Sequence, residues 1–203
     1  MGGGAHPLNG EHYDVQFHKA TPKKIAMWLF LITDGMSFSG FLLAYAVLRA
    51  TKDWPTPADH LGIWLSAFAT FILICSSVSM VFSIDACKAR DRKAMLRWLM
   101  FTIIGGASFL GIQAYEYIHL VHQGITMSSF LQGNNLFGST FYLVTGFHGL
   151  HVLSGVIYLI CQYVFAHRGD YDNGEYEALE ITGLFWHFVD LVWILVFTFI
   201  YLL

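Results

Sequence analysis

The chain alternates between long apolar runs and short polar segments. Five runs reach the roughly 20 mostly apolar residues that a transmembrane helix needs. They span residues 25–48, 61–84, 96–120, 136–165 and 181–203. The segments between them are short and polar, and short connections make consecutive helices antiparallel neighbours. The pattern therefore predicts an all-α integral membrane protein, built as a bundle of five transmembrane helices.

Composition supports this membrane location. Hydrophobic residues make up 56% of the chain and charged residues 12%, against about 25% charged residues in a soluble domain. The net charge of -3 is too small to indicate a nucleic-acid partner. The three cysteines form no CxxC pair, so we expect free thiols and neither a disulfide framework nor a thiolate metal site.

Residues 1–24 differ from the rest of the chain. They are polar, contain three consecutive glycines and lack the apolar core of a cleavable signal peptide. We expect a flexible cytoplasmic tail here, in which His6, His12 and His18 would bind a metal only adventitiously. The predicted organisation is thus a tail at 1–24 and one membrane domain at 25–203.

The positions of lysine and arginine predict the orientation. With the N-terminus inside, nine of these cations fall on the inner side and only Arg49 and Lys52 on the outer side. The nine are Lys19, Lys23, Lys24, Lys88, Arg90, Arg92, Lys93, Arg97 and Arg168. Cytoplasmic loops of membrane proteins carry the excess of positive charge, so we expect the N-terminus inside and the C-terminus outside.

Ionisable side chains inside the apolar runs are the candidate functional residues, because such groups are costly in a bilayer. From helical rise, Asp34 and Asp190 lie about 15 Å from the inner edge, and His187 about 10 Å. His148 and His151 lie about 20–24 Å below Asn135 at the opposite edge. We therefore expect these five residues to share one interior polar layer, with Glu116 near the outer interface.

Helical faces agree with this layer. His148 and His151 are three residues apart, as are His187 and Asp190, so each pair shares a face. Glycines, which allow membrane helices to approach closely, accompany these residues: Gly35, Gly40, Gly146, Gly149, Gly155 and Gly183. Trp193 shares the face of Asp190 and is either a hydrogen-bond donor to the layer or a lipid-facing side chain.

The residues by themselves leave three uses of this layer open. The histidines can be hydrogen-bonded structural or lipid-contacting groups, which is the interpretation we favour. They can also be metal or haem ligands, as in a bis-histidine haem between facing helices. Chains of aspartate and histidine can, thirdly, carry protons through a membrane.

Four motifs resemble those of subunit III of the haem–copper terminal oxidases. Two are Thr145-Gly146-Phe147-His148-Gly149-Leu150-His151-Val152 and Trp186-His187-Phe188-Val189-Asp190-Leu191-Val192-Trp193. The third, Gln113-Ala114-Tyr115-Glu116-Tyr117, looks like the Gln-x-x-Glu-Tyr signature of that family. The fourth is Thr33-Asp34 followed by Phe38, Phe41, Ala44 and Tyr45. The resemblance covers about residues 25–203 and places Gln113 among the site residues.

This resemblance implies a subunit without a redox centre in a proton-pumping, aa3-type cytochrome c oxidase of the aerobic respiratory chain. Haems and copper would reside in subunits I and II, so this chain would bind no metal or haem and would contain no catalytic residue. It would pack on subunit I, bind phospholipids, and support proton uptake and catalytic lifetime. Subunit II, subunit IV and a respiratory supercomplex are the further partners, and the bacterial plasma membrane is the implied location.

The chain departs from the longer members of that family in two ways. It matches only the last five of their seven helices, so a complete V-shaped lipid cleft is not expected within this subunit. Asp34 stands where mitochondrial-type members have a buried glutamate, and it is our candidate for tuning proton uptake. Subunit III of a quinol oxidase is the alternative within the superfamily, and an independent membrane haem protein or proton carrier is the alternative outside it.

Overall fold

The computed structural model describes residues 21–51, 62–122, 136–172 and 176–202. Their helices are α1 (Pro22–Thr51), α3 (Ile63–Lys88), α4 (Arg92–His122), α5 (Leu136–Arg168) and α6 (Glu177–Phe197), followed by a π-helical turn, η3 (Thr198–Leu202). All five helices are long and apolar enough to cross a membrane. The predicted five-helix architecture is confirmed.

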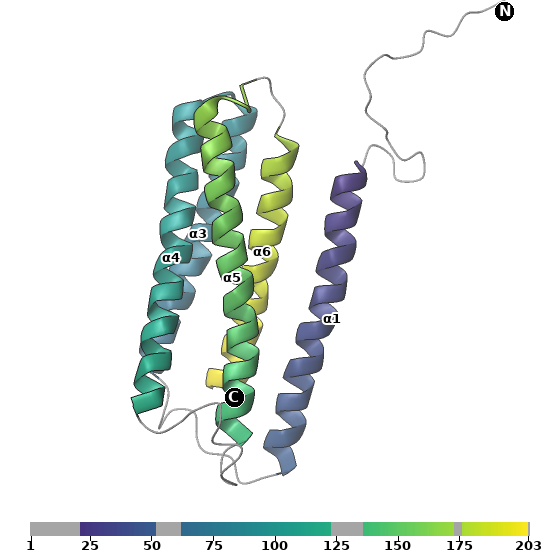
Figure 1. Cartoon of the computed structure of the whole chain (residues 1–203), viewed down its shortest axis with the longest axis vertical. Coiled ribbons are helices and arrows are strands. Elements are labelled where there is room, and N and C mark those ends of the chain that lie inside the picture. The colour runs from purple at the N-terminus through teal and green to yellow at the C-terminus, as the bar shows by residue number, and fades with distance from the viewer. Residues whose placement is uncertain (1–20, 52–61, 123–135, 173–175, 203) are drawn as a thin grey trace, which may run out of the picture.

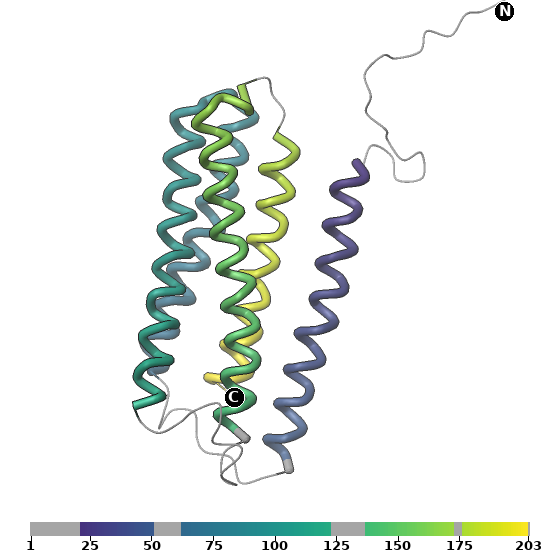
Figure 2. Tube along the Cα trace, in the orientation of Figure 1, coloured from purple at the N-terminus to yellow at the C-terminus, as the bar shows by residue number. Residues whose placement is uncertain are grey.

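Four of the helices form a compact group, and the first stands beside it. Helices α3, α4, α5 and α6 lie side by side, while α1 packs against α6 and α5 (Figure 1). The trace in Figure 2 shows α1 closest to α5 at its C-terminal end and leaning away towards its N-terminal end. α1 therefore joins the group of four through α6 and α5.

The two ends of the bundle differ in charge. One end, here called the basic end, carries Lys24, Lys88, Arg92 and Arg168. The other, here called the C-terminal end, carries Arg49, the end of α4 and η3 (Figure 1). This separation is the feature from which the orientation was predicted.

The polar connection predicted at residues 85–95 is mostly helical. α3 continues to Lys88 and α4 starts at Arg92, so only residues 89–91 form the turn. Arg90 adopts a positive φ of 58° in this turn, and the Asp91 carboxylate accepts a hydrogen bond from the Ala94 backbone N–H at 3.0 Å. Charged side chains can extend from a helix into the headgroup region, so the helices extend beyond their apolar runs.

Helix starts also lie earlier than the apolar runs. α1 begins at Pro22, whereas its apolar run begins at residue 25. α6 begins at Glu177, whereas its apolar run begins at residue 181. Proline suits the first position of a helix because its missing N–H would have no partner there. Residues 22–24 therefore belong to α1, and the rest of the predicted tail, except Thr21, lies outside the described residues.

An ion-pair network joins three helices at the basic end. The Glu180 carboxylate of α6 forms ion pairs with the ammonium groups of Lys24 of α1 and Lys88 of α3, at N–O distances of 2.6 Å and 2.7 Å. Thr21 donates a hydrogen bond to the carboxylate of Glu177 beside it. The ammonium of Lys88 also lies 5.1 Å from the ring centre of Tyr176. These contacts fix the start of α1 to the group of four helices.

Glycines determine how closely the four helices approach. A Cβ atom at Gly106 of α4 would lie 2.5 Å from the Trp186 ring, and one at Gly155 of α5 would lie 2.9 Å from the same ring. A Cβ at Gly183 would lie 2.7 Å from Ile84. The predicted packing role is therefore confirmed at Gly155 and Gly183. At Gly40 and Gly149, by contrast, a Cβ would meet nothing within 4 Å among the described residues.

Candidate functional site

Asp34 and His151 form the polar contact between α1 and α5. The Asp34 Oδ1 atom lies 3.2 Å from His151 Nε2, and Asp34 is 8% exposed. His151 Nδ1 lies 2.8 Å from the carbonyl oxygen of Phe147, one turn earlier in α5. The second carboxylate oxygen, Oδ2, is buried without a hydrogen-bond partner among the described residues. His151 therefore uses both ring nitrogens, one to fix its own ring and one to hold Asp34.

His148 lies one turn away in a different environment. It is completely buried, and neither ring nitrogen has a hydrogen-bond partner in the described part of the chain. Its ring stacks on Trp193 with centres 4.9 Å apart and meets the edge of Phe109 at 5.8 Å. Phe38 of α1 lies edge-on at 6.3 Å. Aromatic rings thus surround this imidazole, which behaves as a packing residue.

His187 and Asp190 face α3 and not α1. His187 Nδ1 lies 2.6 Å from the hydroxyl oxygen of Ser77, and this hydroxyl also interacts with the Asp190 carboxylate. Asp190 is 8% exposed, and its Oδ1 has no hydrogen-bond partner among the described residues. Ser77 therefore connects the two predicted residues of α6 to a helix that carries no charge in its apolar run.

Glu116 is held at the C-terminal end, as its predicted depth requires. Its carboxylate accepts hydrogen bonds from Ser66 of α3 at 2.9 Å and from Tyr201 of η3 at 2.7 Å. It is 5% exposed. Three elements therefore meet at this one carboxylate, which is a structural contact.

Gln113 lies one turn earlier in α4. It is 7% exposed, and its side-chain amide interacts with the hydroxyl of Tyr117. Tyr117 also pairs with the hydroxyl of Thr145 on α5 at 2.7 Å. The Gln-x-x-Glu-Tyr residues thus divide their contacts between α3 and η3 on one side and α5 on the other.

The hydroxyl residues of α3 contact several site residues, although the sequence patterns did not place them among the candidates. Ser66, Thr70 and Ser77 contact Glu116, Trp193 and His187, respectively. A second set, Ser76 and Ser79, contacts Trp186 at 3.2 Å and Thr102 at 2.8 Å. The signal was present, since Ser66, Thr70 and Ser77, at spacings of four and seven residues, lie on one helix face of a charge-free apolar run.

Trp193 faces the interior and not the lipid, but its hydrogen-bond partner is Thr70 of α3 and not one of the five predicted layer residues. Its indole N–H donates to the Thr70 hydroxyl at 2.9 Å, and the residue is 1% exposed. Thr70 in turn donates to the carbonyl oxygen of Ser66 at 2.8 Å. The indole thus links α6 to α3 and at the same time covers one face of His148.

The predicted polar layer is divided into three separate contacts. Asp34 pairs with His151, His148 is enclosed by aromatic rings, and His187 with Asp190 meets Ser77. Within the described residues no three His, Cys, Asp or Glu side chains are grouped so that they could hold a metal ion. These polar groups therefore join helices in pairs: α1 to α5 and α6 to α3.

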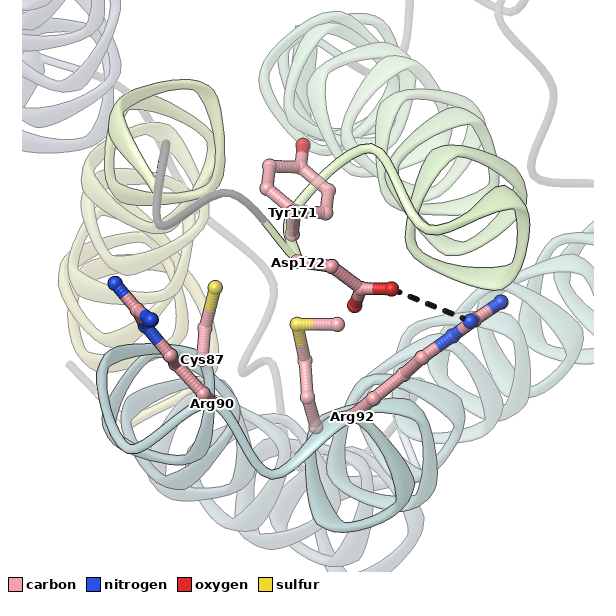
Figure 3. A pocket seen from close by; sticks show the side chains of 6 residues that line it. Cys87, Arg90, Arg92, Tyr171 and Asp172 are labelled. Carbon is pink, nitrogen blue, oxygen red and sulfur yellow. Dashed lines mark hydrogen bonds and ion pairs between the residues drawn. The ribbon is translucent and has the colours of Figure 1, made fainter.

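A small polar recess lies at the basic end of the bundle. Cys87, Arg90, Arg92, Tyr171 and Asp172 line it, and Arg92 pairs with Asp172 at 3.5 Å (Figure 3). Arg92 also donates to the carbonyl oxygen of His167. Burial raises the pKa of Tyr171 to about 12, so its phenol stays protonated at physiological pH and donates to Gln162. Of the two arginines at this recess, Arg92 is thus paired within the chain.

Five membrane-crossing helices joined by buried carboxylate, histidine and hydroxyl contacts define a multi-pass helical membrane protein. The family model for cytochrome c oxidase subunit III matches residues 8–203. The chain belongs to this family, and it is thus a membrane subunit of an oxidase complex that contains other subunits.

Curated relatives from several organisms agree with this assignment. The chain is 35% identical over 175 residues to the probable cytochrome c oxidase subunit 3 of Nocardia farcinica, which covers 85% of this chain and 84% of the relative. It is 35% identical over 182 residues to cytochrome c oxidase subunit 3 of Thermostichus vulcanus, covering 88% and 86%. The corresponding protein of Corynebacterium diphtheriae is 36% identical over 177 residues, covering 85% and 84%.

Proposed function

We propose that the chain is the subunit III, without a redox centre, of a proton-pumping, aa3-type cytochrome c oxidase in a bacterial plasma membrane. It packs on subunit I, assembles with subunit II, and binds phospholipids. Its N-terminus lies inside and its C-terminus outside. Haems and copper belong to the partner subunits, and this chain supports proton uptake and the catalytic lifetime of the enzyme.

The way in which the membrane histidines are used carries this proposal. His151 uses both ring nitrogens within its own helix pair, and His148 is enclosed by Trp193 and Phe109. His187 faces a serine of α3. None of the three faces another histidine at haem-ligand geometry in the described structure, which favours a structural role over a bis-histidine haem.

Cytochrome c as the electron donor is supported by the relatives, which are named as cytochrome c oxidase subunits. Oxygen uptake by the purified complex distinguishes the two donors. We expect uptake with reduced cytochrome c and none with a quinol alone. Uptake driven by quinol without cytochrome c would assign the complex to the quinol-oxidising branch.

The optical spectrum of the separated chain tests the absence of a redox centre. After mild dissociation of the complex, the Soret absorbance should remain with the other subunits. A Soret band stoichiometric with this chain would instead identify it as a membrane haem protein.

Asp34 is the residue that we assign to the support of proton uptake. Its carboxylate is the only acidic or basic side chain in the apolar run at residues 25–48, and one of its oxygens has no hydrogen-bond partner among the described residues. Asp34→Asn should leave the initial rate of oxygen reduction near normal, but the enzyme should inactivate after several-fold fewer turnovers. Asp190→Asn is the matched control, because it removes an equally buried carboxylate from the α3–α6 side, away from α1. Equal turnover numbers for Asp34→Asn and the wild type would refute this role.

A further inference from the structure

Arg49 is a cation whose charge is not neutralised within the described structure. It lies in the last turn of α1, and its Nη1 atom is buried with no hydrogen-bond partner. No ion pair among the described residues includes it. Removing a charged group from water is costly unless it is paired. An anion from outside this part of the chain therefore fits here.

The guanidinium lies at the wall of a recess between α1 and η3. Tyr45, Ala46, Arg49, Ala50 and Phe199 line this recess, whose volume is about 450 Å³. That volume lies in the range of small-molecule sites, which is roughly 300–1,000 Å³. Apart from Arg49 and the Tyr45 hydroxyl, these walls are aliphatic or aromatic. The recess thus combines one unpaired cation with apolar walls.

Its depth places the recess at the headgroup level of a bilayer. Arg49 is 27 residues from the start of α1, which is about 40 Å along the helix. It is 15 residues, or about 22 Å, beyond Asp34. The hydrocarbon core of a bilayer is only about 30 Å thick, so the guanidinium reaches the phosphates of the leaflet at the C-terminal end.

We propose that this recess binds the phosphodiester of one phospholipid from the leaflet at the C-terminal end. The planar guanidinium of Arg49 donates two parallel hydrogen bonds to phosphate oxygens, a geometry that arginine offers and lysine does not. Ala46 and Ala50 leave room for the glycerol, and Phe199 contacts the acyl chains. A carboxylate side chain from a neighbouring subunit would satisfy the charge but leave the apolar recess unfilled.

The basic end provides the internal comparison. Arg92 also lines a recess, but Asp172 and the carbonyl oxygen of His167 satisfy it (Figure 3). Lys24 and Lys88 share Glu180. Arg49 differs from these three cations in having no such acceptor within the described residues.

A headgroup site of this kind rests on the proposed lipid binding and gives it a location, and it can be tested separately from the rest of the function. The purified oxidase is analysed by native mass spectrometry, which counts tightly bound phospholipids per complex. Arg49→Gln should lose one phospholipid, and its affinity for added lipid should fall about 10-fold to 100-fold. Arg49→Lys should recover part of this affinity.

Two further variants make the result specific. Ala46→Trp keeps the cation but fills the recess, so it should lose the same phospholipid. Arg168→Gln removes an exposed arginine at the other end and should retain it. Delipidated enzyme is then mixed with phosphatidylglycerol or phosphatidylethanolamine. Rebinding of either lipid that depends on Arg49 supports recognition of the phosphodiester.

Two outcomes would overturn the proposed phospholipid site. An unchanged phospholipid count in both Arg49→Gln and Ala46→Trp would overturn the proposal. Loss of a partner subunit from Arg49→Gln with an unchanged lipid count would overturn it in favour of a carboxylate from that subunit. The haem content of the same samples reports on the proposed oxidase membership, so failure of one proposal is not confused with failure of the other.

Discussion

At the residue scale, the two histidines of α5 show how neighbouring identical side chains acquire different roles. His151 holds the carboxylate of Asp34 across the α1–α5 contact at 3.2 Å. His148 has no hydrogen-bond partner among the described residues and stacks on an indole. Both rings contact Phe38 of α1 and an aromatic ring of α6, but only His151 reaches the Asp34 carboxylate, whereas His148 also meets Phe109 of α4.

This difference predicts unequal effects of one substitution. His151→Phe leaves the buried Asp34 carboxylate unpaired, which should destabilise the chain by about 1–3 kcal/mol. His148→Phe makes the same change in volume within an aromatic environment and should cost less than about 1.5 kcal/mol. The temperature at which half of the purified complex loses this subunit on a sizing column measures both.

The two variants serve as controls for each other, since both replace an imidazole by a phenyl ring on the same helix. Equal losses of thermal stability would show that His148 makes a polar contact as important as that of His151. In that case the role of His148 as an aromatic packing residue would be wrong.

At the element scale, the glycines of α4 separate packed from open helix faces. A Cβ at Gly106 would lie 2.5 Å from the Trp186 ring and 2.8 Å from Val156, whereas one at Gly111 would meet nothing within 4 Å among the described residues. The two positions lie on one helix, five residues apart. Substitutions at the two positions therefore compare a packed and an open face of the same helix.

Gly106→Ala should destabilise the subunit by about 1–3 kcal/mol, because the large Trp186 ring must move to admit a methyl group. Gly111→Ala should be neutral or stabilising by up to about 1 kcal/mol, since alanine is the better helix former. Thermal dissociation of the purified complex compares them. Tolerance of alanine at 106, or a large loss at 111, would place the close helix contacts on the other face of α4.

At the scale of the whole molecule, the distribution of cations predicts how the bundle lies in the membrane. The basic end carries the ion-pair network of Glu180 with Lys24 and Lys88, and the C-terminal end carries Arg49. Because positive charge is retained on the cytoplasmic side, the basic end should face the cytoplasm.

Reporter fusions check this orientation. Alkaline phosphatase joined after Leu203 should be active, because it folds outside the cytoplasm, and a fluorescent protein joined at the same place should be dark. A truncation after α3 that ends beyond Lys88 and carries the same reporters should give the reverse pattern. Phosphatase activity at the α3 end and none at the C-terminus would invert the assignment.

The sequence predicted best those features that depend on one segment alone, and least well those that depend on contacts between helices. The five spans and the depths of Asp34 and Glu116 come from hydropathy and helical rise, which are properties of each segment alone. The connection at residues 85–95 was predicted too long, because charged side chains at helix ends lie in the headgroup region without ending the helix. The polar face of α3 was missed because serine and threonine add little to hydropathy, although Ser66 and Ser77 satisfy two of the main site residues.

By itself, the sequence determined that this is a membrane bundle of five helices with ionisable groups buried near its middle. Apolar runs of about 20 residues cross a bilayer as helices, because a helix satisfies its backbone hydrogen bonds within the segment. The sequence motifs also indicated the oxidase subunit III family. Only the tertiary structure decided that the predicted layer is three contacts: Asp34 with His151, His148 within aromatic rings, and His187 with Asp190 at Ser77. The physical reason is that periodicity fixes the face of each side chain on its own helix, whereas its partner depends on the rotation and approach of a neighbouring helix.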